Sequence, residues 1–170
     1  IIIMILHTLL ALPTVLIGLL VYSFISRRGP LGSFGLLYTQ WAMIIGQVVL
    51  AFPIISSLSL SATQSVDSKV EKTARTLGAN RMQTAAFIFI EGKFALLSAI
   101  ITGFGRVFGE VGISMMLGGN IRGLTRNITT AIAFETGKGE FALGIALGLV
   151  LLTVALAVNI LLYSLRWKRG

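Results

Sequence analysis

The sequence contains no cysteine and a single histidine among its 170 residues. Disulfide bonds, thiolate catalysis and cysteine-ligated metals are therefore excluded, and His7, in an apolar stretch, is better explained as a helix residue than as a metal ligand. The sequence also lacks the G-x-x-x-x-G-K-[ST] motif that binds nucleotide phosphates, and it has no cluster of histidine, carboxylate and nucleophile. We therefore predict no metal, no cofactor and no catalytic residues.

Charged residues are scarce as well: they make up 12% of the chain, against 55% hydrophobic residues, and the mean hydropathy is +0.92. Soluble domains carry about 25% charged residues, so this composition indicates an integral membrane protein. The net charge of +8 would favour nucleic acid as a partner of a soluble protein, but in a membrane protein the position of each charge matters more. We expect a lipid bilayer around the chain and no nucleic acid.

Long apolar segments predict the fold class, an all-α polytopic helical membrane protein with one transmembrane domain over residues 1–170. Pro13 and Pro53 predict bends in the first two spans. Because the sequence opens on Ile1 rather than on methionine, we expect a first span to precede it. The four spans are expected near residues 4–26, 40–61, 94–117 and 141–165.

Basic residues are distributed unequally between the two predicted sides of the membrane, eight against five. Cytoplasmic loops of membrane proteins carry an excess of lysine and arginine. We therefore predict that residues 62–93 and the C-terminus face the cytoplasm, in the inner (plasma) membrane. One side holds Lys69, Lys72, Arg75, Arg81, Lys93, Arg166, Lys168 and Arg169, and the other holds Arg27, Arg28, Arg122, Arg126 and Lys138.

The polar stretch EKTARTLGAN, residues 71–80, predicts two short helices joined by a turn at Gly78. Asn80 is the expected N-cap of the second helix, and Ser68 with Glu71 fits a capping box at the start of the first. The two amphipathic helices suit docking into a groove of a water-soluble partner, and a helix pair on the membrane surface is the alternative. The apolar faces comprise Val66, Val70, Ala74 and Leu77, then Met82, Ala85, Ala86 and Phe89.

The same stretch resembles the EAA loop of permeases in binding-protein-dependent ABC importers, whose usual form is E-A-A-x₃-G-x₉-I-x-L-P. Ala74, Gly78 and Ile88 fall on motif positions. The departures are Lys72 and Thr73 in place of Glu-Ala, with Glu71 one position early, and Ile90 and Glu91 in place of Leu-Pro.

Three further stretches resemble oxyanion permeases of the molybdate and tungstate type, with tungstate permeases the closer match. They are HTLLALPTVLIGLLVYSFISRRGPLG, GFGRVFGEVGISMMLGGNIRGLTRNITTAIA and ETGKGEFALGIALGLVLL. The resemblance implies a type I (MetI-like) permease fold of about five spans, a homodimer, separate ABC ATPase subunits and a substrate-binding protein that delivers the oxyanion. The implied ATPase-coupling residues are Val70, Glu71, Ala74, Leu77, Gly78, Ala79 and Ile88.

Two ionisable residues, Arg106 and Glu110, lie in the third predicted span. Residues four apart share a helix face, so they can pair, and charges within the membrane are candidates for the transport pathway. The alternative is a structural pair that orients the helix. Gly105 and Gly109 form a small-xxx-small pattern that predicts close helix approach, and Gly109 is a further pathway or packing candidate.

The loop after this span contains GGNIRGLTRNITT, in which Asn127 is the expected N-cap of a helix of about nine residues ending near Gly137. We expect arginine and threonine side chains here to guide an oxyanion through exchangeable hydrogen bonds. The alternative is that the arginines meet the binding protein or lipid headgroups. The candidates are Arg122, Thr125, Arg126, Thr129 and Thr130.

A secondary transporter or channel that works without ATPase partners is the alternative function. That class would place more ion-coupling acids and polar residues within the spans. Here only Arg106, Glu110 and a few amides such as Gln47 and Asn159 qualify, so the importer permease is preferred.

Overall fold

The computed structural model describes residues 2–167, and Lys168 and Arg169 of the predicted basic tail lie outside them. Every regular element among the described residues is helical, which confirms the all-α prediction. The elements are α1 (Ile2–Leu10), α2 (Thr14–Ile25), the 3₁₀ helix η1 (Gly32–Phe34), α3 (Gln40–Gln64), α4 (Ser68–Thr76), α5 (Arg81–Glu91), α6 (Lys93–Phe108), α7 (Gly112–Gly118), α8 (Ile128–Gly137) and α9 (Phe141–Trp167).

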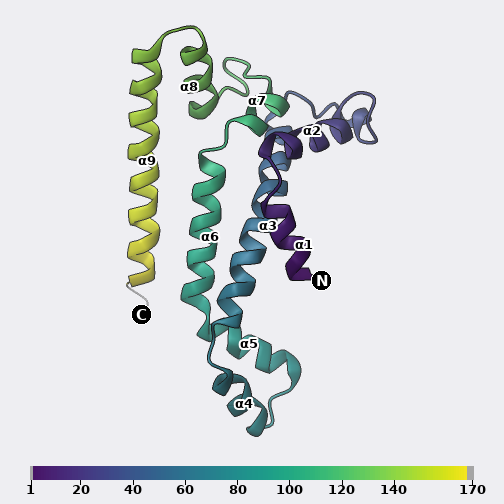
Figure 1. Ribbon diagram of the computed structural model, residues 1–170, viewed down its shortest axis with the longest axis vertical. Helices are drawn as coiled ribbons and strands as arrows, with labels where there is room; N and C mark the ends of the chain where they lie inside the picture. Colours follow the sequence, from purple (N-terminus) through teal and green to yellow (C-terminus); the bar gives the residue numbers. More distant parts are fainter. Residues whose placement is uncertain (1, 168–170) are drawn as a thin grey trace.

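The long helices α3, α6 and α9 set the long axis of the molecule (Figure 1). The most extensive helix contact is between α3 and α6, and α9 packs against α8 and α6. Helices α4 and α5 form a hairpin at one end of the molecule, while α2, α7 and α8 gather at the other end (Figure 1). The long helices thus end in the α4–α5 hairpin on one side of the molecule and in the group of α2, α7 and α8 on the other.

The predicted span 4–26 is not one bent helix but two helices, α1 and α2, which meet at 100°. Pro13 occupies the N-cap position of α2 with φ −59° and ψ 135°, an extended conformation that interrupts the helix. Helix α1 packs along α3, whereas α2 packs across α7 and α3. The proline allows the break, and the packing of α2 gives the turn its large angle.

Helices α3 and α9 are each long and apolar enough to cross a membrane. Helix α3 includes all of the predicted segment 40–61, and α9 that of 141–165. Thr39 caps α3 by accepting the N–H of Ala42, and Pro53 lies inside α3 without ending it. Each of the pairs α1–α2 and α5–α6 would pass the same test as one broken span, which gives up to four spans among the described residues.

The predicted span 94–117 is also interrupted, because α6 ends at Phe108 and α7 begins at Gly112. Between them the Glu110 N–H donates to the carbonyl of Val107 at 3.0 Å, a tightened last turn. The Glu110 carboxylate then accepts the N–H of Ile113 in the first turn of α7. The sequence predicts a continuous helix here, whereas the structure interrupts it at residues 109–111, where the buried Glu110 lies.

The hydrophobic core lies where α2, α3 and α7 meet. Ile113 and Leu117 of α7 are completely buried there against α3. A side chain at Gly46 of α3 would collide with both of them, so glycine is needed for this approach. By contrast, no residue in the apolar window of α9 is buried, so α9 presents apolar surface on most of its sides. The core residues are Ile17, Val21, Ile25, Ala42, Leu50, Ile113 and Leu117.

Candidate functional site

The hairpin of α4 and α5 is held by caps at the start of each helix. Asp67, not Ser68, is the N-cap of α4, and its carboxylate accepts the N–H of Lys69 at 2.9 Å. The predicted capping box of Ser68 and Glu71 is therefore wrong, and Glu71 instead pairs with Arg75 at 2.7 Å. The prediction for α5 is confirmed, since Asn80 caps it in a reciprocal capping box with Gln83, both bonds 2.9 Å.

Gly78 makes the turn between the two helices, with φ +84°. The Gly78 N–H donates to Arg75 and the Ala79 N–H donates to Ala74, both at 3.0 Å, which is the Schellman arrangement for ending a helix. A Cβ at position 78 would meet no atom within 4 Å. The requirement for glycine here comes from the left-handed backbone and not from lack of space.

The apolar residues predicted to dock onto a partner differ in exposure, and their docking role stays a prediction. Ala74 is buried between α4 and α5, and Val70 is half-buried. Leu77 and Met82, on either side of the turn, are 82% and 84% exposed. We call Leu77 and Met82 the hairpin tip. Ala74 is thus part of the packed interior of the hairpin, and the tip carries its most exposed apolar side chains, while Phe87, Phe89 and Ile90 of α5 are more than half exposed as well.

The hairpin joins the long helices at a corner that the sequence does not reveal. Gly92 separates α5 from α6, which meet at 67°. A Cβ on Gly92 would lie 3.2 Å from the carbonyl oxygen of Ile88 and 3.3 Å from a methyl group of Val66. Ile88 is half-buried at this corner. Because Val66 follows the end of α3, the corner is packed against both α3 and α6.

At the other end of the molecule, Glu110 is the most buried charged side chain among the described residues, with 5% of it exposed. Arg106 donates to its carboxylate at 3.2 Å, which confirms the predicted pairing although Glu110 lies beyond the end of α6. The Glu110 carbonyl accepts the hydroxyls of Thr129 at 3.1 Å and Ser114 at 3.5 Å. Glu110 therefore connects α6, α7 and α8.

The three predicted pathway threonines bury their hydroxyls in bonds within the chain. Thr125 accepts the N–H of Ile121 at 2.9 Å and donates to the carbonyl of Gly118. Thr129 donates to Glu110, and Thr130 forms the capping box of α8 with Asn127, whose capping role is confirmed. A guiding role for these hydroxyls stays a prediction, and their hydrogen bonds explain their presence without it.

The two predicted outer arginines differ in their surroundings. Arg126 donates to the side chain of Asn120 at 3.2 Å and lies over the ring of Phe134, 4.5 Å from its centroid. Lys138 lies over the same ring at 4.0 Å and pairs with Glu135 at 2.9 Å. Arg122 is exposed and joins no ion pair among the described residues. Of the two arginines, Arg122 is the one whose charge is available to a ligand.

A cavity of about 260 Å³ opens beside Glu110, between α3, α6, α8 and α9. Most of its lining is apolar, and Arg106, which pairs with Glu110, is half exposed. The lining residues are Gln47, Phe104, Val107, Phe108, Glu110, Asn127, Ile128, Thr129 and Leu151.

The glycines in α6 and at its C-cap divide between packed and open positions. A Cβ at Gly103 would collide with Ile55 of α3, whereas Cβ atoms at Gly105 and Gly109 would meet nothing within 4 Å. The close approach predicted from Gly105 and Gly109 is therefore wrong within this chain, and Gly103 makes the contact instead. The described residues contain no group of three or more histidine or acidic side chains suited to a metal.

These features define a multi-pass α-helical membrane protein. It has an amphipathic hairpin at one end and, around Glu110 at the other end, polar residues that hydrogen-bond to one another. Comparison with known proteins places it more narrowly. The family described as binding-protein-dependent transport system inner membrane component matches residues 1–167. The chain therefore belongs to this family of membrane transport components.

Individual relatives are similar over most of the chain. The tungstate uptake system permease protein TupB of Peptoclostridium acidaminophilum is 44% identical over 95% of this chain and 71% of its own length. The TupB protein of Campylobacter jejuni is 43% identical over 96% of this chain and 68% of its own length. The molybdenum transport system permease protein ModB of Escherichia coli K12 is 34% identical over 94% of this chain and 73% of its own length.

Proposed function

We propose that the chain is the permease subunit of an ATP-driven importer of tungstate or, failing that, of molybdate or sulfate. The identities of 44% and 43% to tungstate permeases, against 34% to a molybdenum permease, support tungstate as the substrate. In this proposal two copies of the chain form the pathway, and a binding protein delivers the anion. Separate ATPase subunits bind the hairpin on the cytoplasmic side, where the C-terminus also lies.

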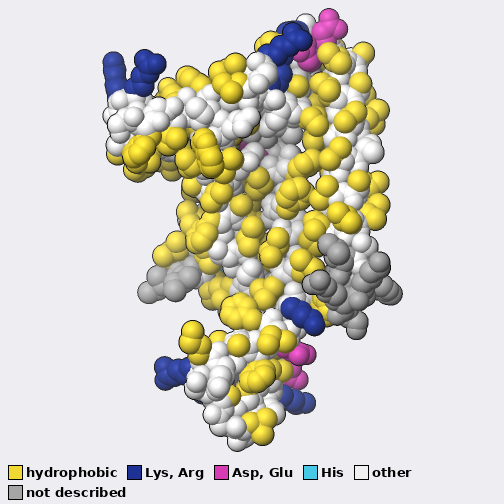
Figure 2. Space-filling view, turned by 180° about the vertical axis from the view of Figure 1, so that it is seen from behind, with side chains coloured by type: hydrophobic (Ala, Val, Ile, Leu, Met, Phe, Trp, Pro, Cys, Tyr) yellow, Lys and Arg dark blue, Asp and Glu magenta, His cyan; other side chains and the backbone are white. Residues whose placement is uncertain are grey.

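The exposed hairpin tip is the observation that carries this proposal. Leu77 and Met82 are more than four-fifths exposed although the hairpin is otherwise rich in charge. Figure 2 shows hydrophobic side chains among basic and acidic ones on this part of the surface. Large apolar side chains held in water on a rigid, capped hairpin suit insertion into a groove of a soluble protein.

The corner at Gly92 would carry a displacement of the hairpin into the membrane helices. Helix α5 continues into α6 there, and Val66 at the end of α3 lies against the corner. Because even a Cβ at Gly92 would press on Ile88 and Val66, the corner is tightly packed, and we expect a movement of α5 to be passed on to α6. ATPase closure would in this way change the relation of α3 and α6.

The pathway residues are proposed at the other end. Arg106, half exposed beside the cavity at Glu110, and Arg122, exposed in the loop before α8, offer guanidinium groups to a tetrahedral dianion. Glu110 would hold Arg106 in place, and Gly109 leaves the adjoining surface open.

The test is to replace Leu77 and Met82 together by aspartate, in the complex expressed with its ATPase and binding protein. We expect ATPase co-purification to fall by more than about tenfold, since two charges would enter an apolar groove. Anion uptake should fall in parallel, and the level of permease in the membrane should stay unchanged.

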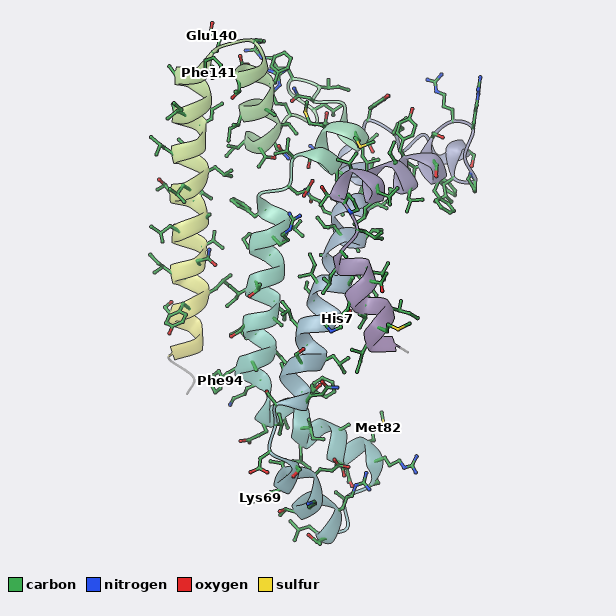
Figure 3. All side chains as sticks on the ribbon, viewed as in Figure 1. His7, Lys69, Met82, Phe94, Glu140 and Phe141 are labelled. Carbon is green, nitrogen blue, oxygen red and sulfur yellow. The ribbon has the colours of Figure 1, made fainter. Side chains whose placement is uncertain are left out.

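Lys69→Asp is the matched control, because it places an aspartate on the same hairpin away from the tip. Figure 3 shows Lys69 and Met82 on opposite sides of the hairpin. The control should retain co-purification and uptake. Normal ATPase binding by the double variant, with Lys69→Asp also normal, would contradict docking at the tip and favour a hairpin that lies on the membrane surface.

A further inference from the structure

Helix α2 carries apolar side chains that the rest of the described chain leaves about half exposed. Its inner face, Ile17, Val21 and Ile25, is buried against α3 and α7. Leu16, Leu20 and Phe24 follow one another at helical spacing on another face, and each is 40–54% exposed. An exposed apolar row of this kind needs either lipid or a second protein surface.

The direction of α2 distinguishes it from the membrane-crossing helices. It turns by 100° from α1, which runs along α3, so α2 crosses the direction of the long helices. Figure 1 places α2 at the level of α7, at the end of the molecule opposite the hairpin. With 12 residues, it would span only about 18 Å even if it were upright.

Two arginines follow directly on this apolar row. Arg27 and Arg28 are exposed, and neither joins an ion pair among the described residues. The turn that presents them is closed by the Leu31 N–H, which donates to the carbonyl of Phe24 at 3.0 Å. Figure 2 shows a basic pair pointing away from the hydrophobic underside of this arm of the molecule.

Hydrogen-bond donors surround the same turn. A hollow of about 550 Å³ beside it is lined by Arg27 and Arg28 together with Tyr22, Ser26 and Tyr38. Guanidinium and hydroxyl groups are donors that suit phosphate oxygens. Trp41, 66% exposed in the first turn of α3, lies where aromatic residues mark the boundary between hydrocarbon and headgroups.

We propose that α2 lies in the plane of the membrane surface opposite the hairpin and binds anionic phospholipid. Leu16, Leu20 and Phe24 lie among the acyl chains, and Arg27 and Arg28 bind the headgroup phosphates. A row of apolar side chains that is followed by cationic hydrogen-bond donors is typical of an interfacial helix. Contact with a second copy of the chain is the alternative way to cover the apolar row. This proposal does not depend on the transported substrate or on the ATPase.

Depth measurements with spin labels test the orientation. The chain lacks cysteine, so single cysteines can be placed at positions 16, 20 and 24 of the permease complex, labelled and reconstituted in phosphatidylglycerol–phosphatidylcholine vesicles. Collisions with oxygen and with a water-soluble nickel chelate then give the depth of each label. We expect all three labels at one shallow depth, with oxygen favoured over nickel.

The matched control is the row Ile44, Val48 and Phe52 of α3, which has the same spacing and is also exposed. These labels should change in depth by about 6 Å from each to the next, because α3 crosses the membrane. The same progression along α2 would overturn the proposal. Low collision with both reagents along α2, as in a contact between two copies, would overturn it as well.

Lipid preference tests the arginines separately. A tryptophan at position 24, in a complex whose permease has Trp41 and Trp167 replaced by phenylalanine, reports contact with brominated lipids. We expect the relative affinity for brominated phosphatidylglycerol, compared with brominated phosphatidylcholine, to be higher by about fivefold for each arginine. Replacing both arginines by glutamine should remove this preference, and replacing both by lysine should retain it. An unchanged preference in the glutamine variant would overturn the headgroup contact.

Discussion

Two glutamate–arginine pairs with the same spacing lie at opposite ends of the molecule, and they differ in burial. Glu71 and Arg75 approach to 2.7 Å in the hairpin, with 45% and 64% of their side chains exposed. Arg106 and Glu110 are 3.2 Å apart, and Glu110 is only 5% exposed. Water and salt screen the shorter pair, whereas the buried carboxylate depends on its partners. The burial of the carboxylate, not the distance between the charges, therefore decides which pair contributes more to stability.

The same contrast applies to the two ends as a whole. The hairpin keeps its charges in water and exposes large apolar side chains at its tip, which suits contact with a partner. The opposite end buries polar side chains on one another, and no buried side-chain nitrogen or oxygen among the described residues lacks a hydrogen bond. A satisfied polar cluster is rigid and defines one arrangement of the helices around it.

Glu110→Ala is one of the two changes with the largest predicted effect. The change removes the partner of Arg106 and the acceptor of the Ile113 N–H, and it enlarges the neighbouring cavity. We expect the free energy of unfolding to fall by about 1–3 kcal/mol, visible as a lower thermal midpoint of the purified permease in detergent. A midpoint equal to that of Glu71→Ala would show that burial does not separate the two pairs.

The second prediction compares the loss of stability on replacing a packed and an open glycine of α6. Gly103→Ala should destabilise by about 1–3 kcal/mol, because the new methyl group collides with Ile55. Gly105→Ala should be neutral or stabilising by up to about 1 kcal/mol, because its surroundings are empty and alanine favours helix. Thermal midpoints of both variants in detergent are the measurement. Equal loss in Gly105→Ala would reveal another helix packed on that face.

A third effect concerns the hairpin turn. Gly78→Val should weaken the hairpin by about 1–2 kcal/mol, since a β-branched residue disfavours φ near +84°. Gly78→Asn should lose much less, because asparagine tolerates the left-handed conformation. Amide hydrogen exchange within α4 and α5 should rise in the valine variant only. Equal exchange in the two variants would contradict the conformational explanation.

The smallest predicted effect is that of Glu71→Ala. An exposed pair with this spacing on a helix contributes about 0.3–0.5 kcal/mol, which salt reduces further. Stability should therefore change little, and the difference should vanish at high ionic strength. If hydrogen exchange in α4 rose as much as in Gly78→Val, the pair would be more important than its exposure indicates.

Local patterns predicted local structure well. The helix, glycine turn and helix around Gly78, the caps at Asn80 and Asn127, and the extents of α3 and α9 all follow from residues close in sequence. These features depend on backbone preferences and on hydrogen bonds that span a few residues. Side chains far away in the chain change them little.

The errors came from contacts between distant segments. Hydropathy alone predicts one span across Pro13 and another across Glu110. In the structure α2 turns onto α7 after Pro13, and Glu110 connects three helices. Spacing grouped Ala74 with Leu77 but could not show that Ala74 is buried and Leu77 is 82% exposed. Nothing near Gly103 in sequence distinguishes it from Gly105, because the difference is Ile55 on another helix.

Reconstituted transport tests the central claim most directly. The permease, its ATPase and its binding protein would be placed in liposomes, and uptake of tungstate would be measured with and without ATP. The account predicts uptake only when all three components and hydrolysable ATP are present, and loss of that uptake when Leu77 and Met82 are replaced by aspartate. Uptake by the permease alone, driven by an ion gradient, would contradict the account and establish a secondary transporter or channel instead.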